Sequence, residues 1–170
     1  GILQEIEATD GAPEKIKKAI VPDFENVYYP MKPIVPYAEV VHDRINLEIM
    51  RGCPHRCRFC HAVMFKNKLR FRTVETLLHQ AETVYNNTGY ESMALSSLSS
   101  GDHPHIAELM TRLNARFAPR NVNITLPSLR VDDKLAELPR LMKTVRKGGF
   151  TVAPEGGTET LRKIIRKPIK

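Results

Sequence analysis

Strand-like and helix-like segments alternate along this 170-residue chain, and their order constrains the fold more than any other feature. In residues 45–50, Ile45, Leu47 and Ile49 alternate with Asn46, Glu48 and Met50, which is the periodicity of a strand. Further strand patterns cover residues 93–98, 122–126 and 150–153, and each is followed by a helical pattern. Strands that alternate with helices form parallel sheets, so the sequence predicts an α/β fold with about four parallel β-α units.

The helical patterns have recognisable ends. Thr73 is a predicted N-cap of the first helix, and Gly89 is its predicted stop. The second helix is predicted to open at Asp102, and the third lies within residues 138–147. Thr158 is the predicted N-cap of a last helix. That helix is expected to turn its apolar residues inward, namely Leu161, Ile164 and Ile165.

Four β-α units do not close a barrel, because the free edge of the fourth strand would expose unpaired backbone groups. The sheet is therefore either open or part of a truncated TIM-type β/α barrel. Residues 1–43 are predicted to form an irregular N-terminal extension, since five of the twelve prolines lie within the first 36 residues. Residues 44–170 are predicted to form the domain that holds the β-α units, incomplete at its C-terminus.

All three cysteines of the chain, Cys53, Cys57 and Cys60, lie within eight residues, directly after the first strand pattern. Ligands of parallel sheets bind at the carboxyl ends of the strands, which is where this loop begins. An odd number of cysteines this close together does not form a disulfide framework, so a metal site is the natural interpretation. Three thiolates on one loop suit a 4Fe-4S cluster with one open iron, and Gly52 allows the backbone to turn closely around it.

Other interpretations of the loop stay open. Residues 57–61 match the C-x-x-C-H signature of haem attachment, which leaves Cys53 without a role. Three cysteines with His55 or His61 match a structural zinc site. Unliganded structural cysteines are the remaining alternative.

The charge balance favours a polyanionic partner, since 26 basic and 19 acidic residues give a net charge of +7. Lys66, Lys68, Arg70 and Arg72 alternate, so an extended chain would align them on one face for a polyanion; a solvated loop face is the alternative. The histidines outside the loop, His103 among them, are expected at the surface or at helix caps. No run of 18 apolar residues exists, so we expect no membrane span and a cytoplasmic location.

The C-x3-C-x2-C loop, with Phe59 just before its last cysteine, resembles the radical S-adenosylmethionine (SAM) superfamily. Residues 33–61, 95–101, 126–131 and 153–158 resemble uncharacterised radical SAM proteins that are often fused to cobalamin-binding-like modules and are related to methylthiotransferases. This resemblance implies a partial TIM-type barrel of six β-α units, of which the chain holds about four. It also implies a 4Fe-4S cluster on the three cysteines and SAM at the open iron, cleaved by one electron to a 5′-deoxyadenosyl radical.

The resemblance further implies candidate contacts to SAM. Phe59 matches a position whose backbone contacts adenine, and Ser99 to Gly101, followed by Asp102, stand where the superfamily often has Gly-Gly-Glu for the SAM amine. Asp102 is equally well explained as a helix cap, and Arg130 as a solvated arginine. The candidate cofactor-binding residues are Phe59, Ser99, Gly101, Ser128, Arg130 and Glu155.

The partners implied are SAM, an external electron donor, an RNA substrate, the missing barrel units and a cobalamin-binding-like module. Because two β-α units are missing, the chain is expected to hold a cluster without necessarily catalysing a reaction by itself. A zinc-stabilised basic module that binds nucleic acid without catalysis is the alternative function.

Overall fold

The computed structural model describes residues 7, 9–15, 18–65, 68–127, 129–130, 153–167 and 169. Within them, β1 (Ile45–Glu48), β4 (Ser92–Ser96) and β5 (Asn123–Thr125) form a parallel sheet in the order β1-β4-β5. Ile45 pairs with Met93, and Ala94 pairs with Thr125. The α/β class is confirmed, and the three parallel strands are consistent with a partial TIM-type barrel.

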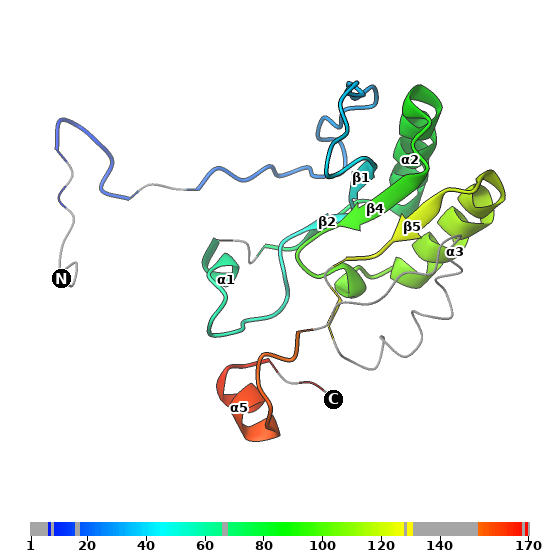
Figure 1. The fold of residues 1–170 in the computed structure, drawn as a ribbon. Helices are drawn as coiled ribbons and strands as arrows, with labels where there is room; N and C mark the ends of the chain where they lie inside the picture. Colours follow the sequence, from blue (N-terminus) through cyan, green and yellow to red (C-terminus); the bar gives the residue numbers. More distant parts are fainter. Residues whose placement is uncertain are drawn as a thin grey trace.

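Two helices, α2 (Val74–Thr88) and α3 (Ile106–Phe117), lie side by side against the sheet (Figure 1). The edge strand β1 buries alternate residues: Ile45 and Leu47 are 2% and 0% exposed and share one apolar cluster with the helices, whereas Asn46 between them is exposed. The central strand β4 buries three residues in succession, Met93 to Leu95. The alternation in β1 gives the sheet one apolar face under the helices and one face with polar side chains, as in the strands of a β/α barrel.

The predicted ends of α2 are confirmed. The Thr73 hydroxyl accepts a hydrogen bond from the Thr76 N–H at 3.2 Å, and Gly89 ends the helix with φ 69°. The predicted start of α3 at Asp102 is wrong, because residues Ser100–Asp102 form a separate 3-10 turn, η1, and the helix begins at Ile106. The Asp102 carboxylate accepts hydrogen bonds from two other side chains and does not cap a helix.

Part of the N-terminal segment packs on this body. Phe24 is 3% exposed, and the Tyr29 hydroxyl donates to the carbonyl of Asn46 at 2.8 Å. The Glu25 carboxylate accepts from the Thr73 N–H at 2.9 Å and from the Thr73 hydroxyl at 2.6 Å. Because helix N-termini attract negative charge, Glu25 stabilises the start of α2 from outside the helix. The domain boundary after residue 43 stays a prediction.

The first predicted strand is shorter than expected. β1 ends at Glu48, and the next residues form β2 (Met50–Arg51), which pairs antiparallel with β3 (Arg70–Phe71). The pairing of β2 with β3 brings the two ends of the intervening segment together, so that this segment forms a closed excursion from the sheet. It holds the three cysteines and the short helix α1 (Ala62–Phe65).

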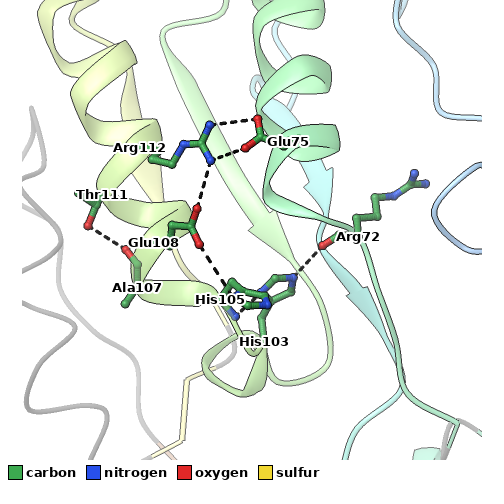
Figure 2. Close-up of polar contacts among 8 residues, drawn as sticks. All are labelled: Arg72, Glu75, His103, His105, Ala107, Glu108, Thr111 and Arg112. Atoms are coloured by element: carbon green, nitrogen blue, oxygen red, sulfur yellow. Dashed lines mark hydrogen bonds and ion pairs between the residues drawn. The ribbon is translucent and has the colours of Figure 1, made fainter.

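His103 joins the turn before α3 to the chain that follows β3, as Figure 2 shows. Its Nε2–H donates to the carbonyl of Arg72 at 3.0 Å, and its Nδ1 accepts from the His105 N–H at 3.2 Å. Of the two positions expected for His103, the structure has the helix cap: His103 is the C-cap of η1, and its side chain is 1% exposed rather than at the surface. Further along α3, Arg112 bonds Glu75 of α2 at 2.5 and 3.0 Å and so ties the two helices together.

The predicted third helix and all of the predicted fourth strand except Ala153 fall within residues 131–152, outside the described part of the chain. The last predicted helix is α5 (Glu159–Ile164), and the Thr158 hydroxyl caps it by accepting from the Leu161 N–H at 3.2 Å. The expectation that Leu161 and Ile164 turn inward is wrong, since they are 44% and 54% exposed. None of the described helices is both long and apolar enough for a membrane span.

Candidate functional site

The cysteine loop, residues 52–61, starts directly after β2. Gly52 has φ 95°, a left-handed value that suits glycine, so the predicted close turn is present. The Cys60 N–H donates to the carbonyl of Cys57 at 3.1 Å and closes a second turn. All three thiols are free of disulfides; Cys57 is buried, while Cys53 and Cys60 are half-buried.

Side chains that follow the other two parallel strands reach this loop. After β4, Asp102 Oδ2 lies 2.7 Å from Nε2 of His55, which stands between Cys53 and Cys57. After β5, Arg130 Nη1 lies 3.7 Å from the sulfur of Cys57. The carboxyl ends of β1, β4 and β5 thus meet around the cysteines, as parallel strands allow.

The turn after β4 holds two of the predicted SAM contacts. Ser99 is 3% exposed, and its hydroxyl donates to Oδ2 of Asp102 at 2.6 Å, the same oxygen that pairs with His55. A Cβ added to Gly101 would lie 3.7 Å from a side-chain carbon of Leu129, so this turn lies against the segment that follows β5. The pair His55–Asp102, which we call the loop latch, connects the cysteine loop to this turn.

Other predicted contacts lie beside Phe59, whose ring is 53% exposed. Glu155 has a positive φ of 64°, and its carboxylate pairs with Lys167 at 3.0 Å. The Lys167 ammonium also lies 5.7 Å from the centre of the Phe59 ring, within range of a cation–π contact. The backbone N–H of Arg58 donates to the carbonyl of Ile165 at 2.9 Å, and this hydrogen bond holds the end of α5 against the loop. Ser128 lies outside the described residues.

The electrostatics of the loop disfavour the thiolate form of Cys53. Burial raises the pKa of the Cys53 thiol, a backbone hydrogen bond from His55 acts the other way, and negative charge on Asp102, Cys57 and Cys60 raises that pKa further. A positively charged iron–sulfur core would relieve this mutual repulsion, because thiolates are its ordinary ligands. The donor set therefore fits a cluster.

The zinc alternative finds no support in the described residues. Among them, no group of three or more His, Cys, Asp or Glu side chains is arranged to hold a single metal ion, and because this includes the three cysteines it does not separate zinc from a cluster. The two histidines of the loop have other contacts. His55 pairs with Asp102, and His61 packs edge-on against the Phe65 ring with centroids 4.6 Å apart.

The predicted basic stripe is not a polyanion surface. Arg72 is 2% exposed, with its guanidinium 4.6 Å from the centre of the Phe24 ring and bonded to the carbonyl of Glu25 at 3.0 Å. Arg70 donates to the carbonyl of Val21 at 3.0 Å. The N-terminal segment therefore covers two of the four side chains, and Lys66 lies outside the described residues.

Sequence reasoning missed the loop latch and the contacts of Lys167 with Glu155 and Phe59. It also missed a pocket of about 590 Å³ beside the cysteines. The only signal for the latch was topological: both partners follow strands whose carboxyl ends lie at one edge. The residues that line the pocket are Arg56, Cys57, Arg58, Phe59, Cys60, His61, Met64 and Arg166.

Comparison with known proteins agrees with the loop chemistry. Residues 47–170 match the family described as the Radical SAM superfamily. The chain is also 39% identical over 124 residues to an uncharacterised protein of Methanocaldococcus jannaschii. That alignment covers 73% of this chain and 26% of the relative, so the chain spans about a quarter of the relative's length.

Proposed function

The chain belongs to the radical SAM superfamily, and we propose that its cysteine loop binds a 4Fe-4S cluster through Cys53, Cys57 and Cys60 in a protein that cleaves SAM reductively. The observation that carries this proposal is a set of three free thiols on one loop where the ends of three parallel strands meet. When bound, the cluster supplies the electron that splits SAM into methionine and a 5′-deoxyadenosyl radical, and an external donor replaces that electron.

The residues around the cysteines have separate tasks in this proposal. Cys57 is buried, which keeps water away from its sulfur. Arg130 Nη1, at 3.7 Å from that sulfur, is placed to donate a hydrogen bond to it. The loop latch holds the segment between Cys53 and Cys57 against the turn after β4.

SAM itself is proposed to bind the same strand ends, through the backbone of Phe59 and through Ser99, Gly101, Ser128, Arg130 and Glu155. Asp102 joins this set, because the two hydrogen bonds that its carboxylate makes with described side chains both use Oδ2, so we propose Oδ1 as the acceptor for the SAM amine. The Glu155 carboxylate already pairs with the Lys167 ammonium. To contact the ribose or methionyl group of SAM, this carboxylate would have to accept a second hydrogen bond or release Lys167.

The remaining elements of the proposal concern the whole protein. We propose an RNA substrate, a cytoplasmic location, and assembly of these β-α units with further barrel units and a cobalamin-binding-like module. The net charge of +7 supports a polyanionic substrate, and the likeness to radical SAM proteins supports the other elements.

The test is anaerobic reconstitution with iron and sulfide. The wild-type chain should take up about four of each and become brown, and addition of SAM should change the electron paramagnetic resonance spectrum of the reduced protein. Cys57→Ser should lose most of the iron while the circular dichroism of the metal-free chain is unchanged.

His61→Ala is the matched control within the same loop, because His61 is exposed and contacts Phe65 rather than a cysteine. It should keep the iron content of the wild type. Unchanged iron in Cys57→Ser, or stoichiometric zinc in protein that resists reconstitution, would refute the cluster.

A further inference from the structure

The segment that carries the cysteines leaves and rejoins the body at two short stretches, residues 50–51 and 70–72, which we call the neck. Arg51 of β2 pairs with Arg70 of β3, and the Arg72 N–H donates to the carbonyl of Ile49 at 3.0 Å. Cys53 lies only two residues beyond Arg51, so the geometry of the neck decides where the cysteine loop begins. Contacts that hold the neck therefore act on the cysteines from a distance.

Phe24, from the N-terminal segment, lies against guanidinium groups from both sides of the neck. The centre of its ring is 4.9 Å from Cζ of Arg51 and 4.6 Å from Cζ of Arg72. Phe24 is 3% exposed and Arg72 is 2% exposed, and cation–π contacts that are shielded from water are stronger than those at a surface. One aromatic side chain thus joins the outgoing and the returning part of the chain.

Hydrogen bonds fix the backbone around Phe24 against the returning side of the neck. Arg70 Nη1 donates to the carbonyl of Val21 at 3.0 Å, and Arg72 Nη1 donates to the carbonyl of Glu25 at 3.0 Å. The two acceptors stand on either side of Phe24 in the sequence. The ring is therefore held in one position, and through its contact with Arg51 it fixes the outgoing side of the neck as well.

We propose that Phe24 is a positioning residue for the cluster site and acts through Arg51 and Arg72. This inference rests on the proposed function, because it takes the three cysteines as cluster ligands. A loop whose two ends are already held loses less conformational freedom when its thiolates converge on one cluster. Phe24 holds those ends, so it keeps the cysteine loop at the ends of the parallel strands before and after the cluster binds.

The first test compares the wild type with Phe24→Leu, which keeps an apolar side chain at this position and removes the aromatic ring. Labelling of the buried Cys57 by a thiol reagent is followed in the metal-free chain by mass spectrometry at low conversion. Loss of both cation–π contacts should raise the labelling rate by about fivefold to thirtyfold, because the reagent reaches Cys57 when the loop opens.

The second test uses the reconstituted chain and a readout that a general loss of stability does not move. Phe24→Leu should keep the iron content of the wild type, because all three cysteines are present. The electron paramagnetic resonance signal of its reduced cluster should shift, since the ligands are held in a different arrangement. The concentration of SAM that produces half of the spectral change should increase severalfold.

The matched control is Ile124→Val, because Ile124 is 1% exposed in β5 and belongs to the apolar cluster of the body. It removes core packing and leaves the neck intact, so it should keep the wild-type labelling rate and spectrum. Equal increases in Cys57 labelling in the two variants, or wild-type labelling and spectrum in Phe24→Leu, would overturn the proposal.

Two further comparisons keep the outcome decisive. If Phe24→Leu loses the circular dichroism of the folded chain, Arg51→Gln is measured in its place, since the Arg51 side chain is only half-buried and its loss removes one of the two contacts. Labelling is measured without iron, so failed iron uptake by the wild type refutes the proposed function alone. Normal iron uptake with unchanged labelling and spectrum in the variant refutes the role of Phe24 alone.

Discussion

The sheet with α2 and α3 and the cysteine loop with α5 are held in place by different forces. In the first region, which we call the body, Leu109, Leu113 and Phe117 are 0% exposed and pack in one apolar cluster. In the second, Phe59 and Leu161 are 53% and 44% exposed, and hydrogen bonds connect the loop to the chain that follows the strands, between His55 and Asp102 and between Cys57 and Arg130. The body therefore provides stability, and the loop provides chemistry that is open to ligands.

The largest expected effect is on the body. Phe117→Ala should lower the free energy of unfolding by about 3–5 kcal/mol, because it leaves a cavity among α2, α3 and the sheet. Leu161→Ala in α5 should lower it by about 1 kcal/mol or less, since Leu161 is 44% exposed and lies outside the apolar cluster. Urea unfolding followed by circular dichroism measures both. Similar losses in the two variants would show that α5 is part of the same packed core.

A smaller effect is expected where the two regions meet, at the loop latch. Asp102→Ala should cost about 2 kcal/mol, because it leaves the buried Ser99 hydroxyl and His55 without their acceptor. Adding His55→Ala to Asp102→Ala should lower the free energy of unfolding little further, because the interaction between the two side chains is already lost in the single variant. The double-mutant cycle in urea measures this coupling, and the rate at which a thiol reagent labels the metal-free cysteines should rise several-fold in each variant.

The control for the latch is His105→Ala, since His105 is largely exposed and lies 3.9 Å from Glu108. It should leave the labelling rate unchanged. Additive losses from His55→Ala and Asp102→Ala would mean that the two side chains act independently and that the loop is held by other contacts.

Much of the body could be predicted from the sequence, because local rules decide it. Thr73 and Gly89 bound α2 as predicted, and the apolar stripes of α2 and α3 became the core. The two-residue strands β2 and β3 could not be predicted, since strands this short carry no periodicity. Their pairing depends on the position of the chain after β1 and not on local preference.

The site was predictable only as far as its cysteines. Their spacing within one loop identified them without any structure, whereas the partner of Asp102 lies 47 residues away and has no sequence signal. Arg72 was misinterpreted for the same reason, since Phe24 and Glu25 cover it from a segment that was expected to be an irregular extension. Contacts between polar residues that are far apart in the sequence depend on how the whole chain folds, so local sequence patterns do not predict them.

The smallest expected effect is a pH dependence of the free energy of unfolding that comes from His103 in the body. Burial lowers the pKa of His103 below its ordinary value of 6.5, although its hydrogen bond to Arg72 acts the other way and His105 adds to the lowering. The folded chain thus keeps His103 neutral, and the unfolded chain takes up the proton first. Stability is fully present above pH 6.5 and falls as the pH drops below it, by less than about 1.4 kcal/mol per pH unit for one proton.

His103→Gln removes this titration while a side-chain amide still offers an N–H to the carbonyl of Arg72. Its free energy of unfolding should therefore fall less steeply than that of the wild type between pH 6.5 and about pH 5, so the two curves converge on the acid side. His79→Gln, at an exposed position of α2, should keep the wild-type slope. Parallel curves for the wild type and His103→Gln would show that the buried imidazole takes up its proton equally in both states, and that the body resists acid as uniformly as its apolar packing suggests.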